Sequence, residues 1–267
     1  MLTSLAYDAP SPVCRVLDRV LPGWRQRPDE GALLRVSIDG AGYRVTGVGV
    51  DECAADAWEA AHWVIAAALG AEVEAVQGRL VLHAAGLRWL RGITVLAGEG
   101  HAGKSSVALH LAARGQPLLG DDRLLLDIGA TPPTATSIGL ARKVRIPLPE
   151  DFAPDAIAYA REAARPGGGG ADLLAWDPAI DPPAGTAEPI KQIVILDRDP
   201  SSRNTSCVQL PPIEAASALL PLCGQHAGDA QTLVTAITGL VHRIPVSRLT
   251  ASNSAMAARY LIEGLDR

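Results

Sequence analysis

The sequence has little lysine, phenylalanine or methionine, and its few cysteines are scattered. Only three of its 24 Lys+Arg residues are lysine, and it has one Phe and two Met. Its four cysteines form no Cys-x-x-C pair, which argues against a zinc ribbon or a disulfide framework. The sequence therefore predicts reduced thiols in a cytoplasmic protein.

Long apolar runs and a strong charge bias are also missing. The longest apolar stretch, at residues 63–69, is far too short for a transmembrane helix, and the first residues lack the pattern of a signal peptide. The net charge of −5 does not suit a nucleic-acid binder, which needs a basic surface. We therefore expect no membrane or nucleic-acid partner. The 267 residues suffice for one α/β core with a small appended region.

The run Gly98–Ser105 has the pattern GxxxxGK[ST] of a phosphate-binding loop. Its glycines allow the backbone N–H groups to surround a phosphate, its lysine can reach the β- and γ-phosphates, and its hydroxyl can bind Mg²⁺. An apolar run at 93–97 predicts the preceding strand, and 105–114 the following helix. The sequence therefore predicts binding of ATP and Mg²⁺. The predicted nucleotide-binding residues are Gly98, Glu99, Gly100, His101, Ala102, Gly103, Lys104, Ser105 and Ser106.

Two carboxylates follow the loop's helix where the chain is expected to return beside the loop. Phosphoryl transfer to an alcohol needs a further metal contact and a base for the hydroxyl. Neighbouring strand residues point to opposite faces, so one aspartate can serve the metal and the other the hydroxyl. Ser105 and Asp121 are the candidate metal ligands, and the pattern leaves open which of Asp121 and Asp122 is the base. Together with His83 at the end of an apolar strand, and Lys104, they form the predicted catalytic set.

Several basic residues are candidates to contact the moving phosphoryl group or an acidic acceptor. Arg142, Lys143 and Arg145 gather three cations in four residues, and Lys191 is a weaker candidate. A solvated edge strand explains the cluster equally well. Asp197, at the end of the apolar run 193–196, is a rival metal ligand.

The rest of the chain has alternating helix and strand patterns. Residues 1–30 are expected to be irregular apart from a short helix near Val16, and 150–188 to be a mobile, Pro/Gly-rich segment with one helix at 155–165. A loop is expected at 130–136. The predicted strands are 33–38, 43–48, 80–89, 93–97, 117–122, 123–127, 193–197 and 244–249, and the other predicted helices are 52–76, 213–220, 230–242 and 252–265.

His83–Gly86, the loop Gly98–Ser105, Ala113–Gly115 and Leu118–Asp122 together resemble the HPr serine kinase/phosphorylase family. The resemblance covers about residues 80–127. It implies a P-loop α/β core with a mixed sheet, related to phosphoenolpyruvate carboxykinases, at 77–267. The N-terminal hairpin-and-helix region at 1–76 does not resemble the sensor domain of that family. It also implies that Lys104 holds the phosphates, that Ser105 binds Mg²⁺, and that Asp122 accepts the proton of a serine, supported by Asp121.

The match stops at two motifs. The family's metal-binding Glu has no counterpart, because Arg142–Arg145 stands there, and the segment with the phosphorylase arginine is missing. The chain is similar to the shorter HPr-kinase-like enzymes that phosphorylate lasso-peptide precursors at a C-terminal serine.

The sequence thus predicts an ATP- and Mg²⁺-dependent kinase of a serine in a precursor peptide or protein, which can also form a homo-oligomer. Two alternatives stay open. One is a kinase of a small-molecule alcohol or carrier protein. The other is a nucleotide switch or ATPase without a covalent product, for which Asp197 would be the key carboxylate.

Overall fold

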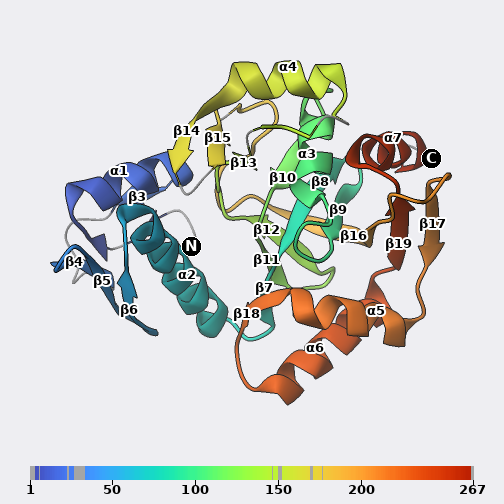
Figure 1. Cartoon of the computed structure of the whole chain (residues 1–267). Helices are drawn as coiled ribbons and strands as arrows, with labels where there is room; N and C mark the ends of the chain where they lie inside the picture. Colours follow the sequence, from blue (N-terminus) through green and yellow to red (C-terminus); the bar gives the residue numbers. More distant parts are fainter. Residues whose placement is uncertain are drawn as a thin grey trace.

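A computed structural model describes residues 4–265 except 6, 23, 27–33, 146, 150–151, 169–170 and 176. It shows a mixed α/β protein built on a large mixed sheet (Figure 1). None of the helices in the described ranges has both the length and the apolar character needed to cross a membrane.

The large sheet is organised around one long strand, β16 (Ala187–Arg198). The later residues of β16 pair in parallel with both β9 (Gly92–Ala97) and β19 (Val246–Ala251), while its first residues pair antiparallel with β12 (Thr134–Ser137). This strand therefore joins two groups of strands. One group adds β8 (Ala84–Trp89), β10 (Leu118–Gly120) and β17 (Ser206–Gln209), and the other adds β11 (Leu124–Asp127), β7 (Arg79–Leu82) and β18 (Cys223–His226).

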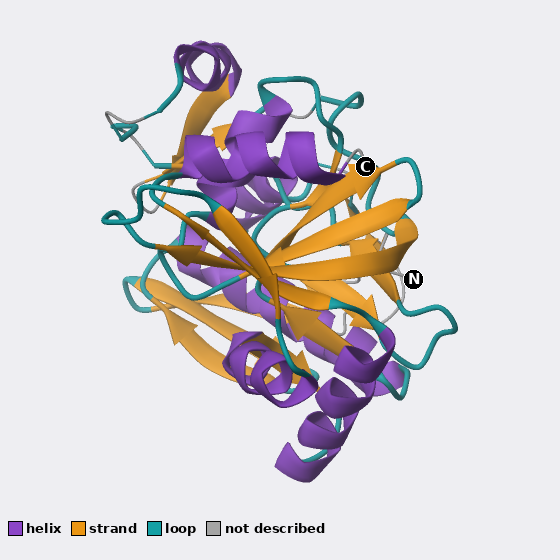
Figure 2. Ribbon diagram, turned by 90° about the vertical axis from the view of Figure 1, so that its right-hand side faces the viewer, coloured by secondary structure: helices purple, strands orange, loops and turns teal. Residues whose placement is uncertain are grey.

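Apolar side chains project from both faces of this sheet because successive side chains of a strand point to opposite faces. Val95 and Ile195 pack on the side covered by α5 (Pro212–Leu219), the short 3-10 helix η1 (Leu220–Leu222) and α6 (Ala230–Arg243). Leu96 and Val194 pack on the side covered by α3 (Lys104–Ala112) and α7 (Ser254–Leu265). Figure 2 shows the twisted sheet with helices on both of its sides.

The N-terminal layer, which we define as residues 4–75, packs against the strands of the second group. It contains the short pair β1 (Ser4–Leu5) and β3 (Arg25–Gln26), the sheet β2 (Tyr7–Asp8), β4 (Leu34–Asp39), β5 (Gly42–Gly47) and β6 (Val50–Ala54), and the helices α1 (Ser11–Val20) and α2 (Ala57–Ala75). A capping box starts α2, because Asp56 accepts from the Glu59 N–H at 2.8 Å and Glu59 accepts from the Ala55 N–H at 2.7 Å.

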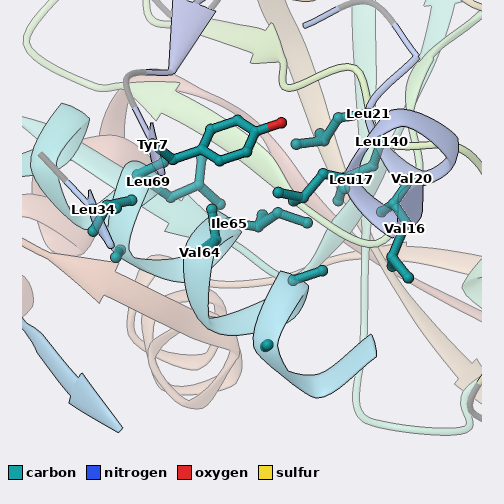
Figure 3. Packing of buried hydrophobic residues seen from close by; sticks show 14 of the residues in the cluster. Tyr7, Val16, Leu17, Val20, Leu21, Leu34, Val64, Ile65, Leu69 and Leu140 are labelled. Carbon is teal, nitrogen blue, oxygen red and sulfur yellow. The ribbon is translucent and has the colours of Figure 1, made fainter. Parts of the chain in front are cut away.

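Helix α2 lies between the N-terminal sheet and the large sheet (Figure 1). One continuous apolar cluster holds residues of the layer together with Val81 of β7 and Leu125 of β11 (Figure 3). Gln225 on β18 also donates to the Ala66 carbonyl of α2 at 2.8 Å. The layer is therefore anchored by both apolar and polar contacts.

The segment after residue 142 is more regular than its composition predicts. It contains β13 (Lys143–Val144), α4 (Pro154–Ala163), β14 (Ala164–Gly168) and β15 (Ala171–Leu174), and β15 pairs with both β13 and β14. The predicted helix is confirmed, but the expectation of little other regular structure is wrong. Mobility of 150–188, like the division at 76/77, stays a prediction.

Other predicted elements agree with the structure in type but not always in extent. The hairpin at 33–48, the strand and helix around the loop, and the four C-terminal elements are confirmed. The strand at 80–89 is interrupted at His83, because β7 and β8 pair with different neighbours. Residues 52–54 belong to β6 instead of a helix, and residues 134–136 belong to β12 instead of a loop. The short strands β1, β2 and β3 lie where irregular chain was expected beside the confirmed helix α1, and β17 and β18 were not predicted.

If α2 is part of one continuous core, truncating Leu69 will destabilise the whole chain. Leu69 is fully buried in the shared cluster, so Leu69→Ala should lower the free energy of unfolding by about 2–5 kcal/mol. Leu90→Ala is the matched control because Leu90 is fully exposed, and it should change stability by less than about 0.5 kcal/mol. Denaturant unfolding measures both, and equal effects would contradict this packing.

Candidate active site

The loop leaves β9 in a conformation that two of its glycines make possible. Gly98 has φ +154°, and a Cβ there would lie 2.8 Å from the Leu196 carbonyl oxygen. Gly103 has φ +99° and is the N-cap of α3. Glycine adopts these two backbone conformations without strain, whereas a residue with a side chain would be strained at either position. His101, at φ +67°, is a non-glycine residue in the left-handed region.

The start of α3 presents donors that no protein group uses. The backbone N–H groups of Lys104, Ser105 and Ser106 find no acceptor in the described part of the chain, and no side chain caps the helix. Nζ of Lys104 donates to the carbonyls of Gly98 at 2.7 Å and Glu99 at 3.0 Å, so the ammonium lies across the loop. Burial lowers the Lys104 pKa. Free N–H groups beside a buried cation are the donor set a phosphate needs, so these residues fit ATP.

Asp121 joins the strand β10 to the loop's helix. Its Oδ1 accepts from the Ser105 hydroxyl at 3.1 Å and from the Asp122 N–H at 2.9 Å. Burial, with the nearby charge of Asp122, raises the Asp121 pKa. A hydroxyl and a carboxylate in contact suit a hard cation. Within the described ranges no group of three or more His, Cys, Asp or Glu side chains could hold a metal, so waters and phosphate oxygens would complete a Mg²⁺ shell.

Asp122 is turned away from its neighbour by a left-handed backbone, with φ +75°. Its Oδ1 lies 3.4 Å from Nε2 of His83, and its Oδ2 lies 3.7 Å from Nε of Arg123. Burial alone would raise its pKa, but the His83 hydrogen bond and the charges of Lys143 and Arg123 hold that pKa at about 2. Asp122 is thus an ionised carboxylate at neutral pH.

Two cations of the predicted clamp lie at this site. Lys143 is close enough to Asp122 and Asp121 for their charges to affect its pKa, which burial lowers. Nη1 of Arg145 donates to Nδ1 of the loop residue His101 at 3.1 Å. The structure therefore brings Lys143 near Asp122 and Asp121 and Arg145 beside the loop.

Lys191 lies away from that clamp, which corrects the sequence prediction, whereas the place of Arg142 in the clamp stays a prediction because most of its guanidinium is used by other partners. The Arg142 side chain is 3 % exposed and makes a bidentate pair with Asp181, at 2.8 and 3.0 Å, and a 2.8 Å hydrogen bond to the Tyr159 hydroxyl. Nε and Nη2 of Arg142 therefore hold the segment 142–181 together, whereas its Nη1 is buried without a hydrogen-bond partner in the described residues and its charge acts on Asp121. Lys191 lies beside Gly92, at the opposite end of β9 from the loop, roughly 16 Å away at the usual strand rise.

Asp197 is the last residue but one of β16 and lies at the same edge of the sheet as the loop, since Ile195 pairs with Ala97. Its side chain is exposed, and within the described ranges it makes no hydrogen bond or ion pair to Lys104, Ser105 or Asp121. The position is compatible with the rival metal site, but the contacts favour Asp121.

Sequence reasoning missed His62 and Arg123. His62, on α2, contacts Lys143 across the boundary between the N-terminal layer and the core. No local pattern marks it, because its partner lies far along the chain. Arg123 directly follows Asp122, and that adjacency was the signal available.

Comparisons with known proteins add little to this geometry. No family model matches the chain, and neither does any curated protein. A solved structure of an HPr(Ser) kinase/phosphatase from Coxiella burnetii is similar over 68 % of this chain and 97 % of that one, at 12 % identity. The TM-score is 0.33, too low to carry a conclusion. The function below is therefore argued from the residues of this chain.

The structural role of Arg142 can be tested through its partner. Asp181→Asn leaves a buried guanidinium without its counter-ion, so the free energy of unfolding should fall by about 3–5 kcal/mol. Asp155→Asn removes the carboxylate of an exposed pair with Arg114 and should cost about 0–1 kcal/mol. Thermal or denaturant unfolding compares the two variants. A small loss for Asp181→Asn would mean that Arg142 is free for another task.

Proposed function

We propose that the protein is an ATP- and Mg²⁺-dependent kinase that phosphorylates a serine hydroxyl of a peptide or protein. The observation that carries this proposal is the connected set Ser105–Asp121–Asp122–His83. It places an ionised carboxylate directly beside the residues that would hold the nucleotide and its metal. A protein that only binds a nucleotide does not need that second carboxylate or its histidine.

The proposed reaction follows from this arrangement. The loop N–H groups and Lys104 would hold the triphosphate, and Ser105 and Asp121 would hold Mg²⁺, which would neutralise phosphate charge. The serine oxygen forms a bond to the γ-phosphorus while the bond to the β,γ-bridging oxygen breaks, and ADP leaves. Asp122 accepts a hydrogen bond from the serine hydroxyl and takes its proton as the bond forms.

A carboxylate with a pKa of about 2 is a weak base. Its contribution is therefore mainly to orient the hydroxyl, which suits a loose transition state in which the oxygen loses its proton late. His83 and Arg123 keep the carboxylate ionised. Arg145, beside the loop, is placed to stabilise charge on the moving phosphoryl group.

The finer part of the proposal is the acceptor, a C-terminal serine of a ribosomal (lasso) peptide precursor. Lys143 supports it. In a C-terminal serine only Cα lies between the carboxylate carbon and the carbon that carries the hydroxyl. A cation next to Asp122 can then bind the carboxylate while Asp122 holds the hydroxyl. The identity of the precursor rests on the family resemblance alone.

Comparing Asp122→Asn with Asp197→Asn separates the kinase from the nucleotide switch. We expect Asp122→Asn to keep Mg·ATP affinity while transfer falls by about 10²–10⁴-fold, towards the lower end because the base is weak. Asp197→Asn should leave transfer nearly unchanged. Lys104→Ala, which should lose ATP binding, is the control for a dead loop. Calorimetry and a radiolabel transfer assay read the two quantities, and the reverse ranking of the two Asp variants would favour the switch.

The acceptor is tested with peptides that end in serine. A free C-terminal carboxylate should raise kcat/KM roughly 10–100-fold over the amidated peptide, the range expected for a charge-assisted hydrogen bond. Lys143→Met should remove that difference. Mass spectrometry measures the added phosphate. If no serine peptide gains mass while a free small alcohol does, the substrate class is wrong and the small-molecule alternative holds.

A further inference from the structure

Helix α2 of the N-terminal layer supplies a histidine to the edge of the proposed active site. Nε2 of His62 lies 3.0 Å from Nζ of Lys143, and Nδ1 of His62 lies 2.8 Å from the Trp58 carbonyl oxygen. Lys143 also lies over the Trp58 ring, 5.6 Å from its centroid. Both His62 and Lys143 are half-buried.

These two contacts determine the tautomer of His62. A carbonyl oxygen can only accept, so Nδ1 must carry the proton, and Nε2 is left with its lone pair. The lone pair accepts from the Lys143 ammonium, which can only donate. A second proton on His62 would sit on Nε2 and face the ammonium donor against donor. The contact therefore exists only while His62 is neutral.

We propose that His62 is a positioning residue of the kinase, which holds the Lys143 ammonium beside Asp122 through its unprotonated Nε2. The inference rests on the proposed function, since it explains how one cation of that site is oriented. It also makes the N-terminal layer a working part of the site instead of a separate module. When the contact is lost, the flexible Lys143 side chain is left with the Trp58 ring and the nearby carboxylates as neighbours.

The charged groups around His62 favour its neutral form. Lys143 from β13 and Arg123 from the turn before β11 both disfavour a second positive charge, and Asp122 opposes them. Burial is the largest effect, and together with these charges it lowers the His62 pKa from its ordinary value of 6.5, although the hydrogen bond to the Trp58 carbonyl opposes the shift. His62 is therefore neutral at pH 7, and the contact breaks only as the pH falls below that ordinary value.

Three variants test the positioning role. His62→Leu removes the acceptor, and His62→Gln replaces it with an amide oxygen that can accept from Lys143. We expect transfer to a serine peptide to fall about tenfold or more in His62→Leu, in kcat or in KM for the peptide, and to recover substantially in His62→Gln. Mg·ATP affinity should stay constant in both. His242→Leu on α6, an exposed histidine away from the site, is the matched control and should change nothing.

The pH profile gives a second readout that a merely structural role would not move. Wild-type transfer should decline as the pH falls below about 6.5, whereas His62→Gln should lack the part of that decline due to His62. His83 and the ATP phosphates are common to both proteins, so the difference reports His62.

The third readout is independent of activity. The chain has only three lysines, so ¹³Cε/¹⁵Nζ-lysine labelling gives few signals to assign. His62→Leu should shift the Lys143 signal and its titration and leave Lys191 unchanged. If wild-type protein phosphorylates no serine peptide, the proposed function fails. If it does, but His62→Leu matches wild type in rate and in the Lys143 signal, this inference fails alone.

Discussion

The site depends on one buried carboxylate. Asp121 sits where β10 meets the phosphate-binding loop, and its Oδ1 accepts both the Ser105 hydroxyl and the Asp122 N–H. A buried carboxylate is costly unless its oxygens are satisfied, so these contacts constrain the geometry on both sides. They hold the hydroxyl toward the metal position and turn the Asp122 side chain away from it. Replacing this carboxylate would therefore disturb the proposed metal site and the proposed base together.

Three parts of the chain converge on that centre, and each contributes a different kind of group. The first group of strands brings the loop and Asp121, the interruption at His83 brings the partner of Asp122, and α2 brings His62 to Lys143. The interruption matters because it lets β7 and β8 join different neighbours, which exposes His83 at the joint. In the same way, the two ends of the shared strand β16 pair with different strands. The site forms where these pairings diverge.

A feature could be predicted from the sequence when the residues that interact lie close together along the chain. The loop, its strand, its helix and the two aspartates lie close together in the sequence, so local pattern and turn chemistry suffice to predict them. The role of Arg142 could not be predicted, because its burial depends on Asp181, 39 residues away. His62 and Lys143 are 81 residues apart and belong to different layers. Lys191 failed as a clamp for the same reason, since only strand register shows that it lies at the wrong end of β9.

The opposite pKa shifts of the two aspartates show how one dipeptide can serve two chemistries. Asp121 is buried, and burial and the charge of Asp122 raise its pKa although the Ser105 hydroxyl lowers it. Asp122 is half-buried, and against the effect of burial His83, Lys143 and Arg123 lower its pKa to about 2. A bound divalent cation would reverse the first shift by favouring the charged carboxylate. In the proposed mechanism Asp121 would thus become a ready metal ligand only when the cation arrives, whereas Asp122 is ionised throughout. Burial acts to raise the pKa of both aspartates, so the His83 contact and the charges of Lys143 and Arg123 are what make the pair asymmetric.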